Sequence, residues 1–249
     1  MRSRRGGAAS FAAAAAAFLL LLYAMPAFAP LFARAFPDVR PPIYRFQSFP
    51  MLFLSHAEIV AASSLAATAA ALALGIFVTR PAGREFRALL GALAAIGQSV
   101  PPVAVLAIAV PVLGYGARPT FVALTLYGFL PILANVIAGI EGVPAAVREA
   151  AQGMGLSPFQ VLRQVELPLA APVILAGIRI SVVISIGTAT IGSTVGAVTL
   201  GTPIIDGLVS DKLPYVIEGA AVVAFFAVLA DMAFERIGRR LRAYAENAA

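Results

Sequence analysis

Six long apolar segments constrain the fold of this chain more than any other feature. Each is close to the about 20 residues that a helix needs to cross the hydrocarbon of a bilayer. None alternates in polarity as a membrane β-strand does. Because hydrocarbon offers no partners to unpaired backbone N–H and C=O groups, a helix is the expected conformation. We therefore predict an all-α membrane protein with six transmembrane helices, over residues 11–33, 58–79, 89–113, 120–140, 169–195 and 215–234.

The composition agrees with lipid as the main solvent. Apolar residues make up 61% of the chain and charged residues 12%, against about 45–50% and about 25% in soluble domains. The net charge is +6, but the Arg residues lie at the edges of apolar runs. This position indicates topology and headgroup contacts rather than nucleic-acid binding. The absence of Cys excludes disulfides and thiolate metal sites.

The first apolar segment has two alternatives. Arg2, Arg4 and Arg5 precede it, and Ala27-Phe28-Ala29 resembles a signal-peptidase site. The apolar run exceeds the about 7–15 residues of a signal sequence and is long enough to span a bilayer. We favour an uncleaved first span, and the cleaved alternative stays open.

Basic residues predict the orientation, because cytoplasmic loops carry an excess of Lys and Arg. Placing both termini in the cytoplasm assigns most of the 18 Lys and Arg residues to that side. The cytoplasmic set is Arg2, Arg4, Arg5, Arg80, Arg84, Arg87, Arg148, Arg163, Arg236, Arg239, Arg240 and Arg242. The outer set is Arg34, Arg40, Arg45, Arg118 and Lys212. We divide the chain into an N-terminal helix with an outer loop (1–56), a main transmembrane domain (57–236) and a cytoplasmic tail (237–249).

The cytoplasmic loop 143–168 is patterned as two short helices with a glycine break. Pro144 opens the first helix, and Gly153 and Gly155 end it because Gly readily takes a left-handed cap. Ser157 then caps the second helix, with Pro158 at its first position, and Pro168 is expected to end it. The first helix is short, so it needs a partner surface. The alternatives are a groove in another protein or the lipid headgroups.

This loop resembles the EAA loop of ABC importer permeases: Glu-Ala-Ala, three residues, Gly, nine residues, Ile, one residue, Leu-Pro. The departure is Val165, which stands where that pattern has Ile. The matching residues are Glu149, Ala150, Ala151, Gly155, Leu167 and Pro168.

The resemblance implies a type I importer permease fold, similar to the methionine importer. It implies that the loop carries a coupling helix that docks in a groove of a separate ABC ATPase. Glu149, Ala150, Ala151 and Gly155 would form the docking surface. The implied partners are ATPase subunits that bind ATP and Mg²⁺, a periplasmic or lipid-anchored substrate-binding protein, and a second or sister permease. This chain itself would hold no cofactor and would lie in the bacterial inner membrane.

Further motifs resemble the branch of this family that imports osmoprotectants such as glycine betaine, carnitine and choline. They include residues 98–101, 177–179 and 186–190. The chain departs from this branch at Gly196-Ala197-Val198-Thr199-Leu200-Gly201, where Gly-Ala-Gly-Gly-Leu-Gly is expected. An importer of another small polar solute therefore stays as an alternative.

Polar residues within the spans are candidates for the solute path, because polar groups in hydrocarbon usually face protein or water. The alternative is that these polar residues form hydrogen bonds between helices and do not contact solute. The double Pro at 101–102 must break the third span, which favours a cavity there. The path candidates are Gln98, Ser99, Asn135, Arg179, Thr188 and Thr190. We expect His56, Glu58, Glu218 and Asp231 to lie at the membrane edges.

Several function classes lack their required residues. Lys212 is the one Lys, and no Gly-x-x-x-x-Gly pattern precedes it, so this chain has no phosphate-binding loop. No catalytic residues and no metal site are predicted, and we do not expect an enzyme. The remaining alternatives to an ABC permease are an ATP-independent secondary transporter and an intramembrane enzyme. Paired acidic residues deep in the spans would favour the former, and a catalytic pair the latter.

Overall fold

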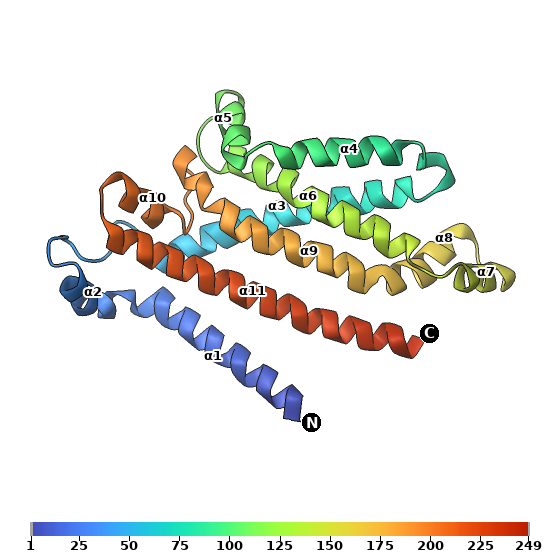
Figure 1. Cartoon of the computed structure of the whole chain (residues 1–249), viewed down its shortest axis with the longest axis horizontal. Helices are drawn as coiled ribbons and strands as arrows, with labels where there is room; N and C mark the ends of the chain where they lie inside the picture. The colour runs from blue at the N-terminus through green and yellow to red at the C-terminus, as the bar shows by residue number, and fades with distance from the viewer. Residues whose placement is uncertain (1, 249) are drawn as a thin grey trace. The chain divides into compact units, whose positions relative to one another are not determined.

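A computed structural model of the chain describes residues 2–248, with the side chains of residues 9–93, 95–97 and 99–241. The side chains of Arg2, Arg4, Arg5, Gln98 and Arg242 lie outside this range. Within residues 2–248 all regular structure is helical (Figure 1). The α-helices are α1 (Arg2–Ala24), α2 (Ala29–Ala35), α3 (Phe49–Val78), α4 (Phe86–Ser99), α5 (Pro102–Leu113), α6 (Ala117–Glu141), α7 (Ala145–Gly153), α8 (Pro158–Val161), α9 (Leu167–Ala189), α10 (Thr202–Val209) and α11 (Leu213–Ala248).

The described residues hold five helices that are long and apolar enough to cross a membrane. They are Ala9–Ala35, Phe49–Val78, Ala117–Glu141, Pro158–Ala189 and Leu213–Leu241. The predicted third span is broken into α4 and α5 at Val100 and Pro101, as the double Pro predicts. Counting this pair as one span gives up to six, so the predicted all-α membrane fold is confirmed.

Several predicted boundaries were wrong. The first segment is interrupted by a 3-10 turn, Met25–Phe28, because Pro26 lacks an N–H. The fifth helix ends at Ala189, and Ile191–Val195 is a separate 3-10 turn. The sixth continues to Ala248. The segment between the fifth and sixth spans contains the short helix α10.

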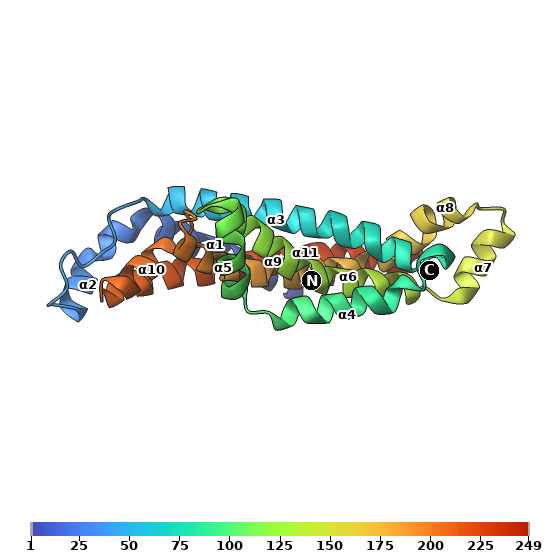
Figure 2. The same ribbon diagram turned by 90° about the horizontal axis from the view of Figure 1, so that it is seen from above.

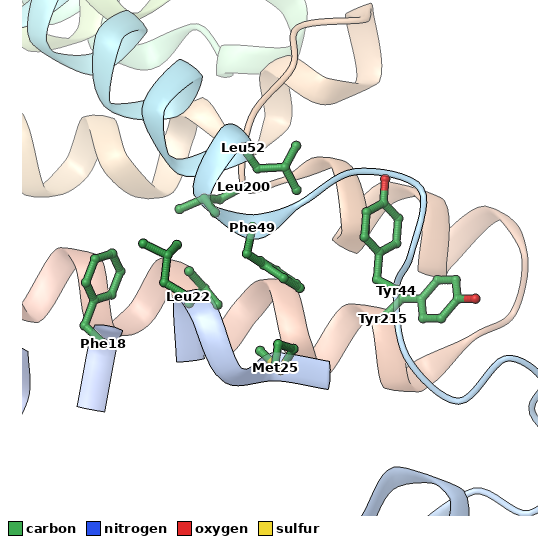
Figure 3. Packing of buried hydrophobic residues seen from close by; sticks show 9 residues of the cluster. Phe18, Leu22, Met25, Tyr44, Phe49, Leu52, Leu200 and Tyr215 are labelled. Atoms are coloured by element: carbon green, nitrogen blue, oxygen red, sulfur yellow. The ribbon is translucent and has the colours of Figure 1, made fainter. Parts of the chain in front are cut away.

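The chain forms two compact units. The first comprises Met1–Ser63, Pro101–Leu124 and Val183–Met232. Its core joins residues far apart in sequence (Figure 3). The rings of Tyr44 and Tyr215 meet edge to face with centroids 5.5 Å apart. The buried members are Phe18, Leu22, Met25, Tyr44, Phe49, Leu52, Leu200, Tyr215 and Val222.

The second unit comprises Ser64–Val100, Thr125–Val182 and Ala233–Ala249. Its core packs α3, α6 and α9 through small side chains. A Cβ on Gly75 would lie 2.5 Å from Cγ1 of Val136, and one on Gly139 would lie 3.1 Å from Cβ of Ala170. Small residues allow such close approach between helices in membranes. The buried members are Ala67, Ala71, Ile132, Leu133, Val136, Ile140, Ala170 and Ile174.

In the second unit, α7 and α8 form a hairpin that extends beyond the end of α6 (Figure 2). The sequence predicted that Pro168 ends the second short helix, and this is wrong. A π-helical turn, Leu162–Glu166, carries α8 into α9, and Leu167 N–H bonds to Leu162 C=O. Pro168 lies in the first turn of α9, where its missing N–H is tolerated because the π-turn has already shifted the bonding pattern.

Candidate functional site

The α7–α8 hairpin leaves most of its apolar side chains exposed. Ala151 is buried at 2% exposure, whereas Val147 is 38%, Phe159 68% and Met154 74% exposed. Glu149 and Ala150 are also exposed. Among Val147, Ala150, Ala151 and Met154, only Ala151 is covered by the chain itself. The hairpin therefore presents apolar surface beside a carboxylate, which is typical of a docking surface.

The turn of the hairpin is built as the sequence predicts. Gly155 has φ +86°, a left-handed conformation that other residues rarely adopt. Gly153 remains within α7. Ser157 N–H donates to Oε1 of Gln160 at 2.8 Å, and Gln160 N–H donates back to Oγ of Ser157 at 3.4 Å. This reciprocal capping box starts α8 at Pro158.

The remaining residues of the EAA pattern lie at the base of the hairpin. Val165 belongs to the π-turn and is half-buried. Leu167 and Pro168, the first residues of α9, are also half-buried. Leu167 packs against the core of the second unit. The structure thus separates the predicted set into an exposed group on α7 with its turn (Glu149, Ala150, Gly155), the buried Ala151, and a base group.

Three of the six path candidates donate to a backbone carbonyl three or four residues earlier in the chain. In the second unit, Ser99 Oγ donates to Ala95 C=O at 3.0 Å, and Asn135 Nδ2 donates to Pro131 C=O at 2.8 Å. In the first unit, Thr190 Oγ1 donates to Gly187 C=O at 2.7 Å. These bonds satisfy the polar groups locally. Arg179 and Thr188 lie in α9 and are partly buried.

Asn135 also sits at a close helix contact. A Cβ on Gly177 would lie 2.6 Å from Cβ of Asn135, so α6 and α9 touch at this point. A nearby groove of about 580 Å³ runs along α4 and α6 and is lined largely by apolar residues such as Leu130 and Ala134. Its charged lining residues, Arg87 and Glu141, form an ion pair with Nη1 and Oε1 2.7 Å apart.

Sequence reasoning missed a buried polar group in the first unit. Glu218, expected near a membrane edge, is fully buried within the protein and accepts the Tyr44 N–H at 3.2 Å. Tyr44 Oη donates to Oδ2 of Asp206 at 3.1 Å. Burial and the Asp206 carboxylate raise the pKa of the Tyr44 phenol above its ordinary value, so it remains a donor at physiological pH. We call Tyr44, Asp206, Tyr215 and Glu218 the tyrosine cluster.

His56 is also buried within the protein. Its exposure is 0%, and its Nδ1 accepts the Leu200 N–H at 3.2 Å. This bond anchors the segment before α10, where Thr199 Oγ1 receives the Gly201 N–H at 2.9 Å. His56 therefore has a structural partner. Among the described residues, no group of His, Cys, Asp and Glu is placed to hold a metal ion.

The chain was compared with known families and proteins. The profile of the family described as "Binding-protein-dependent transport system inner membrane component" matches residues 71–243. The osmoprotectant import permease protein OsmY of Salmonella typhimurium is 41% identical over 75% of this chain and 79% of its own length. The choline transport system permease protein OpuBB of Bacillus subtilis is 42% identical over 69% of this chain and 82% of its own.

Solved structures share the fold. An inward-facing structure of the MetNI methionine ABC transporter matches with a TM-score of 0.68 and 23% identity, covering 76% of this chain and 93% of its own. An amino acid ABC transporter crystallised with histidines matches with a TM-score of 0.63 and 16% identity, covering 88% of this chain and 98% of its own. The predicted type I importer permease fold is therefore confirmed.

Proposed function

The chain belongs to the family of binding-protein-dependent transport system inner membrane components, and from this premise we propose that it forms the membrane path of an ATP-driven importer for a small quaternary amine. Members of this family are permease subunits of ABC transporters and are not themselves enzymes. The chain is a multi-pass membrane protein.

The substrate proposal rests on one observation. Two relatives that are 41% and 42% identical over more than two thirds of the chain are named for osmoprotectant and choline transport. A third, named for glycine betaine, carnitine and choline, is 42% identical over 65% of this chain. The solute is accordingly glycine betaine, carnitine, choline or a similar quaternary amine.

The coupling proposal rests on the α7–α8 hairpin. Glu149, Ala150 and Gly155 form the surface that docks in an ATPase groove, and the buried Ala151 supports this surface from within. Val165, Leu167 and Pro168 fix the base of the hairpin. The exposed Val147, Met154 and Phe159 support this assignment, because large apolar side chains at such an interface gain most from a partner. ATP and Mg²⁺ are bound by that partner.

The remaining assembly follows from the charge pattern and the family. Both termini and the hairpin face the cytoplasm, and a substrate-binding protein, periplasmic or lipid-anchored, delivers solute on the other side. A second copy or a sister permease completes the path. Gln98, Ser99, Asn135, Arg179, Thr188 and Thr190 are the proposed path residues.

Purification of the tagged chain from its native membrane, followed by reconstitution in proteoliposomes, tests the proposal. We expect an ATPase to co-purify and radiolabelled glycine betaine, carnitine or choline to accumulate when ATP is supplied on the ATPase side. Uptake without ATP would instead establish a secondary transporter. ATP-driven uptake of another small polar solute alone would overturn the substrate assignment and retain the permease.

Labelling tests the orientation separately. The chain has no Cys, so a single Cys at Gln152 reports one position. We expect a membrane-impermeant maleimide to label Gln152→Cys from the cytoplasmic side only. Labelling from the outer side of intact cells would contradict the orientation.

A further inference from the structure

Glu166 is a buried carboxylate at the base of the α7–α8 hairpin. It is 2% exposed and is the last residue of the π-turn. Its Oε2 lies 2.6 Å from Nη2 of Arg80, and its Oε1 lies 3.6 Å from Nη1 of Arg148. A charge this deeply buried is retained only when it is paired. We call Arg80, Arg148 and Glu166 the ion-pair cluster.

The ion-pair cluster joins helix ends that are distant in sequence. Arg80 follows α3, Arg148 lies in α7, and Glu166 leads directly into α9. Arg148 Nη2 also donates to Val143 C=O at 2.6 Å and to Glu141 C=O at 3.4 Å. Arg148 therefore caps the last carbonyls of α6 with a positive charge, which favours that helix end. Three membrane helices and the hairpin meet at one carboxylate.

The cluster is more deeply buried than two other ion pairs among the described residues. Arg87 and Glu141 are 53% and 39% exposed. Arg239 and Glu235 lie one turn apart on α11, at 51% and 44% exposure. Exposed pairs of this kind contribute little because water screens them. In the ion-pair cluster one partner is buried, so breaking it leaves an unpaired charge or an unpaired donor.

Resting on the proposed function, we infer that Glu166, Arg80 and Arg148 are positioning residues for coupling. They make α7 move as one body with the ends of α3, α6 and α9. A displacement that the ATPase imposes on the hairpin then reaches three spans at once. Without the cluster, α7 would be held by the chain on either side and by its packing against α8 and the π-turn.

Transport stoichiometry tests this inference. Glu166→Gln keeps the shape of the side chain and removes its charge, so we expect the ATPase to co-purify as with the unmodified chain. Solute imported per ATP hydrolysed should fall by roughly 2- to 30-fold, the range typical of residues that carry coupling. Basal ATP hydrolysis should persist, while its stimulation by loaded binding protein falls in parallel. Arg239→Gln, which breaks an exposed pair on α11, is the matched control and should leave the ratio unchanged.

A purely structural role predicts a different result. It would lower the amount of assembled complex while leaving solute per ATP normal in the complex that remains, and that outcome would overturn the inference. The reversed pair Arg80→Glu with Glu166→Arg should recover part of the ratio lost in Glu166→Gln. Failure of the unmodified complex to transport with ATP would instead contradict the proposed function itself.

Distance measurement provides a readout that does not need full transport activity. Spin labels on Gln152→Cys in α7 and Arg84→Cys after α3 report on two exposed sites in an otherwise Cys-free chain. We expect a narrow distance distribution in the otherwise unmodified chain and a broader one when Arg80→Lys or Glu166→Gln is added. Equal widths would show that the cluster does not hold α7.

Discussion

The α7–α8 hairpin of the second unit and the tyrosine cluster of the first unit treat large side chains in opposite ways. Tyr215 and Tyr44 are 1% and 5% exposed and pack against each other. Phe159 and Met154 in the hairpin are 68% and 74% exposed. The apolar side chains of the first region are covered by its own chain, whereas those of the second remain exposed. The comparison predicts that truncations in the two regions will affect different measurements.

The largest expected effect is on stability, at Tyr215. Tyr215→Ala removes a fully buried aromatic ring and should cost about 3–5 kcal/mol of unfolding free energy. Thermal unfolding in detergent measures this loss. Tyr115→Ala, at a residue that is 80% exposed, should change stability by less than about 0.5 kcal/mol. ATPase binding to the folded fraction of Tyr215→Ala should be normal. Reduced binding would contradict the prediction that the two regions affect different measurements.

Phe159→Ala is the corresponding truncation in the hairpin. Because the ring is already exposed, the unfolding free energy should change by less than about 0.5 kcal/mol. Affinity for the co-purifying ATPase should fall by about 2 kcal/mol, or roughly 30-fold, if the ring is an interface anchor. Titration of the ATPase against the chain in nanodiscs measures it. An unchanged affinity together with lower stability would place Phe159 in the same class as Tyr215.

A pair of glycines sharpens the assignment of the hairpin. Gly155→Ala forces a side chain into a left-handed conformation and should cost about 1–2 kcal/mol, seen as weaker ATPase affinity. Gly153→Ala lies in α7 with no atom within 4 Å of the added Cβ, and should stabilise the helix by about 1 kcal/mol. Equal effects of the two substitutions would contradict the role of the turn.

The smallest expected effect concerns a single hydrogen bond of the tyrosine cluster. Tyr44→Phe keeps the ring contacts and removes the bond to Asp206, so stability should fall by about 1 kcal/mol. Thermal unfolding again measures it, with transport and ATPase binding unchanged. A loss of solute uptake at normal stability would give the cluster a role that its burial does not predict.

Local patterns predicted the parts of the structure that depend on neighbouring residues. The presence of the long apolar helices, the break at the double Pro, the left-handed Gly155 and the Ser157 cap all follow from short stretches of sequence. The roles of these residues in coupling stay predictions, because no comparison or contact tests them.

Partners that are far apart in sequence could not be predicted in this way. Glu166 and Arg80 are 86 residues apart, and Glu218 and Tyr44 are 174 apart. Each carboxylate near the end of an apolar segment is equally compatible with water or headgroups until the fold brings a donor to it. The position of Glu166 directly before Leu167-Pro168 was one available signal for a buried ion pair, since a carboxylate at the start of a span needs a partner.

The π-turn before Pro168 also determines how the junction between α8 and α9 responds to a change in chain length. An i→i+5 turn holds a surplus residue compared with an α-helical turn, and each residue of an α-helix rotates the chain by about 100°. Deleting one residue from 162–166 would therefore replace the π-turn by an ordinary α-helical turn and leave the side of α8 that bears Phe159 facing nearly the same way, whereas deleting a residue from regular α-helix would rotate it by about 100°. The surplus residue thus gives this junction a tolerance of one deletion, and a second deletion would redirect the hairpin while leaving its own residues unchanged.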